Sequence, residues 1–330
     1  MSAINGMSQH FKERTIMYLV CGEALFDFFS EDDASGLASR VNFKAIAGGS
    51  PLNVAVGLRR LGVEAALFAG LSTDYLGRRL QQVLRDEGVC PEFLVDFAAP
   101  TTLAMVAVGA NGSPHYSFRG EGCADRQLKL EHLPPLGPEI RGLHVGSFSL
   151  VVQPIADTLL ALVQRESGKR LISLDPNVRL NPEPNIELWR SRIATLVELA
   201  DLIKVSDEDL SLLYPEQDPQ RVIEGWLEHR CQLVFLTRGG EGATVFSRHH
   251  GSWSVAARPV DIADTVGAGD TFQAALIAWL TEQQLDSVEG VQRLAREQID
   301  AMLKFAVQAA ALTCSKTGPD LPYRHQLEVC

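Results

Sequence analysis

The sequence predicts an α/β fold in which helices cover both faces of a mostly parallel central sheet, with a small β-sheet lid beside it. Apolar runs typical of buried strands alternate with helix-like segments along most of the 330 residues, which is the pattern of a parallel sheet between helical layers. Two stretches, 28–47 and 95–122, interrupt this alternation, and the second contains Asn111-Gly112, a strong hairpin signal. Both are expected to pair into the small sheet, placed to close over a ligand at the carboxyl ends of the parallel strands.

The main elements can be placed in chain order. A buried strand is expected over 18–29. Pro51 in a first helical turn and Gly62 as a stop signal bound a helix over 50–62. A helix with an apolar stripe opens at the end of residues 264–272. The remaining apolar runs predict strands at 65–71, 143–150, 171–177, 201–206 and 233–237, and helices at 75–88, 155–166 and 188–199.

Composition and charge argue against several classes of function. The chain has 30 Lys and Arg against 41 Asp and Glu, a formal net charge of −11, whereas general binding of nucleic acid or an anionic membrane needs a basic face. No apolar run reaches the ~18 residues of a membrane helix. The six cysteines contain no C-x-x-C pair, which favours reduced thiols and a cytoplasmic location. An anionic ligand must then be held by a local site.

Chain length and the first residues bear on domain organisation. The length suits one large α/β domain or two smaller ones. The first residues, M-S-A-I-N-G-M-S-Q-H-F-K-E-R-T, lack the apolar core of a signal peptide. Residues 1–17 are interpreted as an N-terminal extension.

The stretch D-T-V-G-A-G-D-T-F, residues 264–272, raises the main question of function. Gly267 and Gly269 let the backbone turn tightly and let a ligand approach the peptide N–H groups. These donors lack helical partners, and the helix dipole adds positive potential, so the place suits a phosphate. Asp270 either caps the helix or takes part in chemistry, and this stretch alone leaves both readings open.

Other phosphate-binding signatures narrow the class. The sequence has no G-x-x-x-x-G-K-[ST], no G-x-G-x-x-G after its first strand and no H-R-D or D-F-G. P-loop NTPases, Rossmann dinucleotide enzymes and protein kinases are therefore disfavoured. A second glycine-rich turn, L-T-R-G-G-E-G-A-T-V, holds Thr237, Gly239 and Gly242. It either brings backbone close to a nucleotide or is a simple hairpin.

Two motifs together resemble the signatures of the ribokinase-like, or PfkB, carbohydrate kinase family. They are A-G-G-S-P-L-N-V-A-V-G-L-R-R-L-G at 47–62 and D-T-V-G-A-G-D-T-F-Q-A-A-L at 264–276. The similarity runs from about Leu19 to Pro322 and is greatest to bacterial fructokinases, through G-E-A-L-F-D, Y-S-F-R-G-E-G-C-A-D-R-Q-L, D-P-N-V-R and S-D-E-D. The resemblance implies one ribokinase-like three-layer domain over 18–330, into which the lid segments are inserted.

The resemblance also implies a reaction. In such kinases the aspartate of the G-A-G-D loop accepts the proton of the attacking sugar hydroxyl, a role that falls to Asp270 here. The N–H groups of Gly267, Ala268 and Gly269 would hold the charge of the transferred phosphoryl group. The implied substrates are ATP with Mg²⁺ and a ketose, with fructose converted to fructose 6-phosphate. A 2-keto-3-deoxygluconate kinase, another sugar kinase of the family and a non-catalytic sugar sensor are the alternatives.

Sugar-binding residues are implied by the same resemblance. Asp27 would accept hydrogen bonds from neighbouring hydroxyls. Gly48, Gly49 and Asn53 would complete the floor of the site. Arg119 either reaches the sugar from the lid or is an exposed charge. Asn177 and Arg179 follow the carboxyl end of a predicted strand. They either contact the sugar or phosphate, or are a turn residue and a surface charge, respectively.

The nucleotide and cation sites follow in the same way. Thr237, Gly239 and Gly242 match the family's nucleotide turn, and Ser206 and Lys316 lie in segments expected near ATP. Magnesium is expected to bind mostly through water. The family's N-x-x-E is replaced by S-D-E-D, so Asp209 and Glu208 are rival organisers of the metal. Asp264 would belong to a site for a monovalent cation such as K⁺. The β lids of this family often pair between subunits, so the resemblance implies a homodimer.

Overall fold

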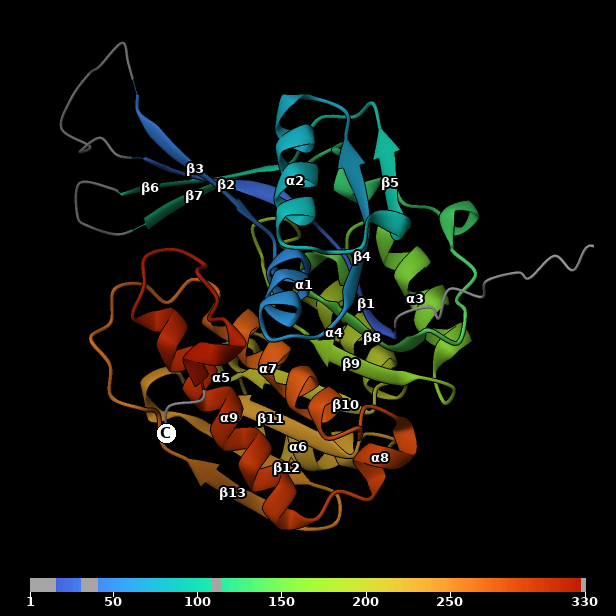
Figure 1. The fold of residues 1–330 in the computed structure, drawn as a ribbon, viewed down its shortest axis with the longest axis vertical. Helices are drawn as coiled ribbons and strands as arrows, with labels where there is room; N and C mark the ends of the chain where they lie inside the picture. The colour runs from blue at the N-terminus through green and yellow to red at the C-terminus, as the bar shows by residue number, and fades with distance from the viewer. Residues whose placement is uncertain (1–15, 31–40, 109–113, 328–330) are drawn as a thin grey trace, which may run out of the picture.

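The computed structural model describes residues 16–30, 41–108 and 114–327. It confirms the predicted α/β fold, with one large sheet between two helical layers and a smaller sheet projecting from it (Figure 1). The large sheet has nine strands in the order β13-β12-β11-β10-β9-β8-β1-β4-β5. Their bounds are β1 Met17–Cys21, β4 Ala65–Ser72, β5 Leu94–Phe97, β8 Ile140–Gly146, β9 Leu171–Asp175, β10 Leu202–Ser206, β11 Leu233–Thr237, β12 Ala243–Ser247 and β13 Gly251–Val255.

Seven strands of the large sheet run parallel to their neighbours, and β12 and β13 add an antiparallel edge. The helices are α1 Ser50–Arg60, α2 Tyr75–Asp86, α3 Ile155–Glu166, α4 Ile186–Val197, α5 Asp207–Leu213, α6 Pro219–Leu227, α7 Ala268–Glu282, α8 Val288–Gln292 and α9 Arg296–Cys314. Short 3-10 turns lie at Pro91–Phe93, Ala124–Arg126, Leu130–His132, Ser147–Leu150, Gly239–Glu241 and Arg324–Leu327. Among the described residues, no helix combines the length and apolar character needed to cross a bilayer.

Two hydrophobic clusters fill the two faces of the large sheet. Tyr18 and Val20 of β1 pack with α1, α2, α7 and α9, whereas Leu19 and Cys21 pack with α3, α4 and α6. Successive side chains of a strand point to opposite faces, so continuous apolar runs are what a sheet covered on both sides requires. The three-layer arrangement follows from this burial.

The lid is a four-stranded sheet in the order β3-β2-β6-β7. Its strands are β2 Leu25–Ser30, β3 Phe43–Gly48, β6 Leu103–Val108 and β7 Pro114–Arg119. The predicted lid segments thus supply strands of one sheet that stands off the main body (Figure 1). The hairpin predicted at Asn111-Gly112 lies outside the described residues.

Three predicted boundaries were wrong. The single strand over 18–29 is two strands, because at Gly22, with φ of 146°, the chain leaves the large sheet for the lid. The strand predicted to reach residue 150 ends at Gly146, and a 3-10 turn follows in which Ser147 has a φ of 59°. Apolar character alone did not reveal these turns. Strand β9 likewise ends at Asp175, two residues before the left-handed Asn177, with φ of 40°.

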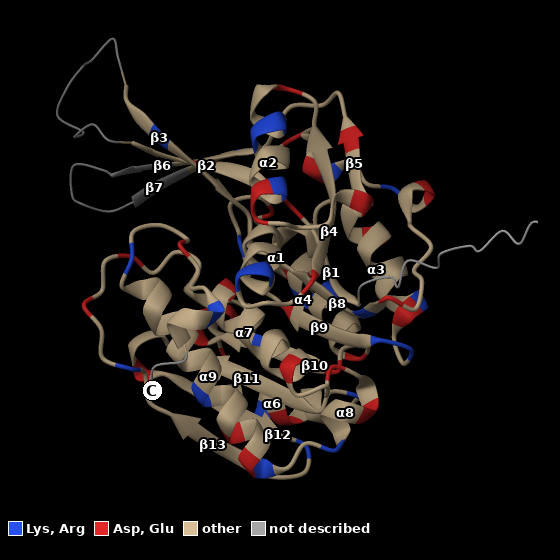
Figure 2. Cartoon of the chain, in the orientation of Figure 1, with Lys and Arg blue, Asp and Glu red and all other residues tan. Residues whose placement is uncertain are grey.

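Charged side chains are mixed over the molecule. Figure 2 shows Lys and Arg interspersed with Asp and Glu along the helices and loops. No single-sign patch dominates this view, so the search for a ligand site turns to the buried charged side chains at the carboxyl ends of the strands.

Candidate active site

The glycine-rich loop at 264–269 opens α7 as the sequence predicts. Gly267 is the residue before the helix and has a left-handed φ of 79°, which favours glycine. The N–H of Thr271 donates to Gly267 O at 2.8 Å, and that of Ala268 donates to Thr265 O at 3.2 Å. The chain therefore turns sharply into α7, with Gly269 in the first helical turn.

Asp270 stands in the first turn of α7 but contacts another helix. Its Oδ1 accepts a hydrogen bond of 2.6 Å from Ser50 Oγ, and its Oδ2 accepts one of 2.8 Å from Asn53 Nδ2. Both donors belong to the first turn of α1, which follows the Gly48-Gly49 pair. The carboxylate is 8% exposed. Two helix N-termini thus converge on one buried carboxylate whose described partners are side chains of α1.

The residues predicted to bind the sugar lie close together where β2 and β3 lead into α1. A Cβ atom on Gly48 would lie 2.2 Å from Asp27 Oδ2, so a side chain at Gly48 would displace the carboxylate. Gly49 has a φ of 103°, and a Cβ there would lie 2.9 Å from Glu23 O. Close approach of two strands and a helix start explains both glycines.

The electrostatics of Asp27 link it to the loop. Burial and the neighbouring Asp270 raise the pKa of Asp27 to about 6, and Arg179 opposes the rise. Asn177 is buried in the turn after β9, and the exposed Arg179 donates from Nη1 to Val178 O at 2.9 Å. Arg119 ends β7 with an exposed side chain, and among the described residues no contact joins it to Asp27 or Asp270.

The predicted nucleotide turn connects β11 to β12. Thr237 ends β11, and Arg238 N donates to Gly242 O at 2.8 Å, which closes the hairpin. Gly239 and Gly242 have φ of 46° and 99°. A Cβ on Gly242 would lie 2.1 Å from Val255 O, so this glycine is also required by the packing of β13. Lys316, after α9, forms an ion pair with Asp320 at 3.1 Å.

The acidic residues considered for Mg²⁺ differ in their surroundings. Ser206 caps α5, and Asp209 Oδ2 accepts hydrogen bonds from Ser206 N at 3.0 Å and Ser206 Oγ at 2.7 Å. Asp209 Oδ1 accepts from Val178 N at 2.7 Å. Glu208 is exposed. Within the described residues no group of three or more His, Cys, Asp or Glu is arranged to hold a metal. Asp209 ties α5 to the turn after β9, whereas Glu208 is open to solvent.

Asp264 bridges two loops. Its Oδ1 accepts from Val266 N at 3.1 Å, and its Oδ2 accepts from Gly318 N at 3.0 Å. The segment after α9 is thereby fixed to the start of the glycine-rich loop.

Sequence reasoning missed a buried ion pair beneath the loop. Lys204 of β10 lies 3.0 Å from Asp175 Oδ2 at the end of β9, and the two side chains are 5% and 0% exposed. A Cβ on Gly269 would lie 3.0 Å from Lys204 Nζ. Burial opposes the charge on Lys204, but Asp175, Asp209 and Asp270 outweigh it and raise the pKa of the ammonium. A fixed positive charge thus lies under the loop. The sequence did carry a signal for this pair: each of the apolar runs L-I-S-L-D and L-I-K-V-S contains a single charged residue, which is unusual in a buried strand.

These features are typical of a small-molecule kinase of ribokinase-like architecture: a glycine-rich loop that opens a helix, a buried carboxylate beside it and a small lid sheet. Comparison with known proteins agrees. The family model described as pfkB family carbohydrate kinase matches residues 16–326. The chain belongs to this family of carbohydrate kinases.

Two similar curated proteins carry fructokinase names. The chain is 36% identical over 279 residues to a fructokinase of Rhizobium leguminosarum bv. trifolii, covering 83% of this chain and 84% of the relative. It is 34% identical over 314 residues to the probable chloroplastic fructokinase-6 of Arabidopsis thaliana, covering 92% and 80%.

Solved structures are similar over nearly the whole chain. The fructokinase of Xylella fastidiosa with bound ATP has a TM-score of 0.84 at 26% identity, covering 94% of this chain and 96% of that one. The fructokinase of Vibrio cholerae O395 with fructose, ADP and calcium ion has a TM-score of 0.78 at 27% identity, covering 94% and 98%.

Proposed function

We propose that this protein transfers the γ-phosphate of ATP to the primary 6-hydroxyl of fructose, giving fructose 6-phosphate and ADP. The observation that carries the proposal is the Asp270 carboxylate, held by Ser50 and Asn53 at the start of α7. The named relatives support fructose as the acceptor.

In this proposal Asp270 is the base. Ser50 and Asn53 each occupy one oxygen of its carboxylate, which fixes its orientation and leaves further lone pairs for a substrate hydroxyl. The hydroxyl oxygen attacks the terminal phosphorus, its proton passes to Asp270, and the bond to ADP breaks. The amides of Gly267, Ala268 and Gly269 hold the charge on the transferred group. Positioning and electrostatics are the main contributions a protein makes to such a transfer.

The sugar would rest on the floor described above. Asp27 accepts hydrogen bonds from hydroxyl groups, Gly48 and Gly49 permit close approach, and the free oxygen of Asn53 remains available to the sugar. The remaining candidates contact the sugar from the turn after β9 and from the lid: Asn177, Arg179 and Arg119. Closure of the lid would exclude water, so that ATP is not hydrolysed.

ATP would lie against the opposite side of the loop. Its contacts are Thr237, Gly239, Gly242, Ser206 and Lys316. Mg²⁺, if held near Glu208, would supply positive charge that offsets the negative charge of the ATP phosphates. Glu208, which is exposed, fits a water-mediated metal contact.

The other cation-site candidates make protein hydrogen bonds. Asp209 is occupied by the backbone of Ser206 and Val178, so we assign it an indirect role in organising the Mg²⁺ site. Asp264, between two loops, is the candidate for a K⁺ site. A fructokinase double mutant of Vibrio cholerae O395, 26% identical to this chain, has been crystallised with fructose, ADP and potassium ion.

We also propose a homodimer formed through the lid sheet, whose outer strands are β3 and β7, and a cytoplasmic location. The five described cysteines are free thiols, which suits a reducing compartment. Sizing in solution tests the dimer, and a monomer at micromolar concentration would contradict it.

A coupled assay of ADP release over ketoses, sugar acids and nucleosides tests the substrate. We expect the highest kcat/KM with fructose, and product analysis should show the phosphate on the 6-oxygen. A higher kcat/KM with 2-keto-3-deoxygluconate would make that sugar acid, and not fructose, the substrate. Sugar binding without any ATP consumption would show that the protein is a non-catalytic sugar sensor.

A further inference from the structure

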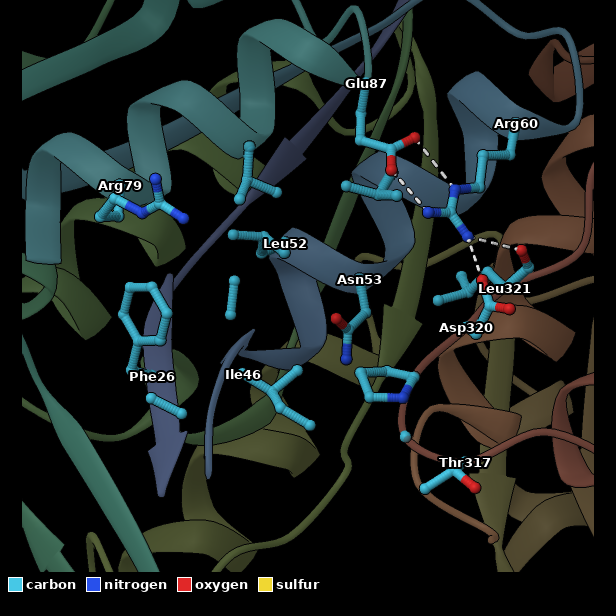
Figure 3. Close-up of a pocket in the computed structure, with 16 residues that line it drawn as sticks. Phe26, Ile46, Leu52, Asn53, Arg60, Arg79, Glu87, Thr317, Asp320 and Leu321 are labelled. Atoms are coloured by element: carbon cyan, nitrogen blue, oxygen red, sulfur yellow. Dashed lines mark hydrogen bonds and ion pairs between the residues drawn. The ribbon is translucent and has the colours of Figure 1, made fainter. Parts of the chain in front are cut away.

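Arg60, the last residue of α1, joins three parts of the chain away from the proposed reaction site. Its Nε and Nη2 donate to Glu87 Oε2 and Oε1 at 2.9 and 2.5 Å, beyond the end of α2. Its Nη1 donates to Asp320 Oδ1 and to Leu321 O, both at 2.8 Å. Figure 3 shows these contacts converging on one guanidinium group. We call Arg60, Glu87 and Asp320 the arginine clamp. A planar guanidinium group that donates several hydrogen bonds in fixed directions holds its partners in place more firmly than a single point charge does.

The segment 317–321, held by the clamp, touches the glycine-rich loop. Gly318 N donates to Asp264 Oδ2 at 3.0 Å, and Asp264 Oδ1 accepts from Val266 N at 3.1 Å. Pro319 packs directly on the next residue of the loop, since a Cβ on Gly267 would lie 2.9 Å from Pro319 Cβ. A series of direct contacts therefore leads from Arg60 through the 317–321 segment to Asp264 and Gly267 of the glycine-rich loop.

Packing alone does not fix this segment. It forms one wall of a cavity of about 400 Å³ whose other walls include Ile46 of β3, Leu52 of α1 and Arg79 of α2 (Figure 3). Leu321 is buried against α1, but Thr317 and Asp320 are exposed. One side of the segment thus faces the cavity. Its position is held by the packing of Leu321 on α1, by the bond from Gly318 N to Asp264 and by the contacts of Arg60.

We propose that Arg60 is a positioning residue for phosphoryl transfer: it holds the 317–321 segment, and that segment sets the position of Gly267 and of the amides that follow. The inference rests on the proposed function, because the loop position matters to turnover only if the loop binds the transferred group. In sites of this kind a displacement of ~1 Å can lower the rate about 100-fold.

Two neighbouring arginines allow a matched test. Arg60→Met removes the clamp. Arg59→Met is the control, because Arg59 pairs with Glu64 and donates to Val63 O at 3.4 Å, both in the short connection between α1 and β4. The two side chains are similarly exposed, at 15% for Arg60 and 21% for Arg59. Kinetics with saturating substrates and amide hydrogen exchange of the ligand-free protein are measured for both variants, at a temperature where each is folded.

We expect Arg60→Met to lower kcat by about tenfold or more, to leave the sugar KM within about twofold, and to accelerate exchange of amides within 264–270. Arg59→Met should keep the wild-type kcat and exchange pattern. Unchanged exchange in 264–270 of Arg60→Met, or an equal loss in Arg59→Met, overturns the proposal.

A second variant and the exchange measurement cover two further cases. Asp320→Asn removes the charged partner of Arg60 on the segment and leaves the contacts of Arg60 with Glu87 and Leu321 O in place. It replaces Arg60→Met if that variant does not fold. A wild-type protein inert toward every sugar would refute the proposed function, whereas the exchange measurement would still decide whether the clamp orders the loop.

Discussion

Ser50 Oγ donates a hydrogen bond of 2.6 Å to Asp270 Oδ1, across 220 residues of sequence. Helices α1 and α7 are thereby joined at their first turns, where each has backbone N–H groups without helical partners. The two motifs that resemble the family signatures thus form one structural unit.

Ser50→Ala should lower kcat by about tenfold while leaving the ATP KM within about twofold. A hydrogen bond to a charged group contributes about 1.5–3 kcal/mol, and about 1.4 kcal/mol corresponds to tenfold. Steady-state kinetics measure the effect. Ser211→Ala is the matched control, because Ser211 Oγ donates to Asp207 O at 2.8 Å on the exposed face of α5. Equal kcat values for Ser50→Ala and wild type would show that Ser50 does not orient the base.

Sugar affinity should weaken as the pH falls through about 6. Burial, with help from Asp270, raises the pKa of Asp27 to about 6, so its carboxylate is charged at pH 7 and protonated at pH 5. Protonation removes acceptor capacity for sugar hydroxyls, and one proton per site predicts roughly a tenfold rise in Kd per pH unit below the pKa. Calorimetric titration with fructose, without ATP, separates this effect from catalysis.

Two variants check the assignment to Asp27. Asp27→Asn should bind sugar weakly with little pH dependence. Arg179→Met should move the midpoint to higher pH, because Arg179 opposes the rise in the pKa of Asp27. A wild-type Kd that stays constant from pH 7 to 5 would be incompatible with this role.

Gly48→Ala should raise the sugar KM by about tenfold or more. The added Cβ would lie 2.2 Å from Asp27 Oδ2, so the carboxylate must move from its place on the sugar floor, and misplaced contacts of this kind are costly. Gly225→Ala is the control, since a Cβ there meets nothing within 4 Å. If the sugar KM of Gly48→Ala equals that of Gly225→Ala, Gly48 is not part of the sugar-binding site.

The Lys204–Asp175 pair should matter for activity beyond stability. Lys204→Met leaves Asp175 as a buried, unpaired carboxylate and should cost about 3–5 kcal/mol of folding free energy. Lys204→Met combined with Asp175→Asn should recover most of that stability but not kcat, because the positive charge beneath Gly269 is gone. Thermal unfolding and kinetics measure the two effects. Wild-type kcat in the stable double variant would mean that the pair is only structural.

The sequence predicted local features better than long-range contacts. The turn into α7 was predictable because Gly267 and Asp270 are local signals of a helix start. The break at Gly22 was not, because its φ of 146° serves the path to the lid rather than a local turn motif. The Ser50–Asp270 and Lys204–Asp175 contacts depend on which helices and strands become neighbours, and periodicity does not carry that information.

The most direct measurement of the central claim is turnover by Asp270→Asn, which keeps the size of the side chain but removes the proton acceptor. We expect kcat to fall by about 10²–10⁴-fold, with fructose and ATP still binding in calorimetry within a few fold of wild type. Turnover within about twofold of wild type would contradict the account, because no base would then be required at the start of α7.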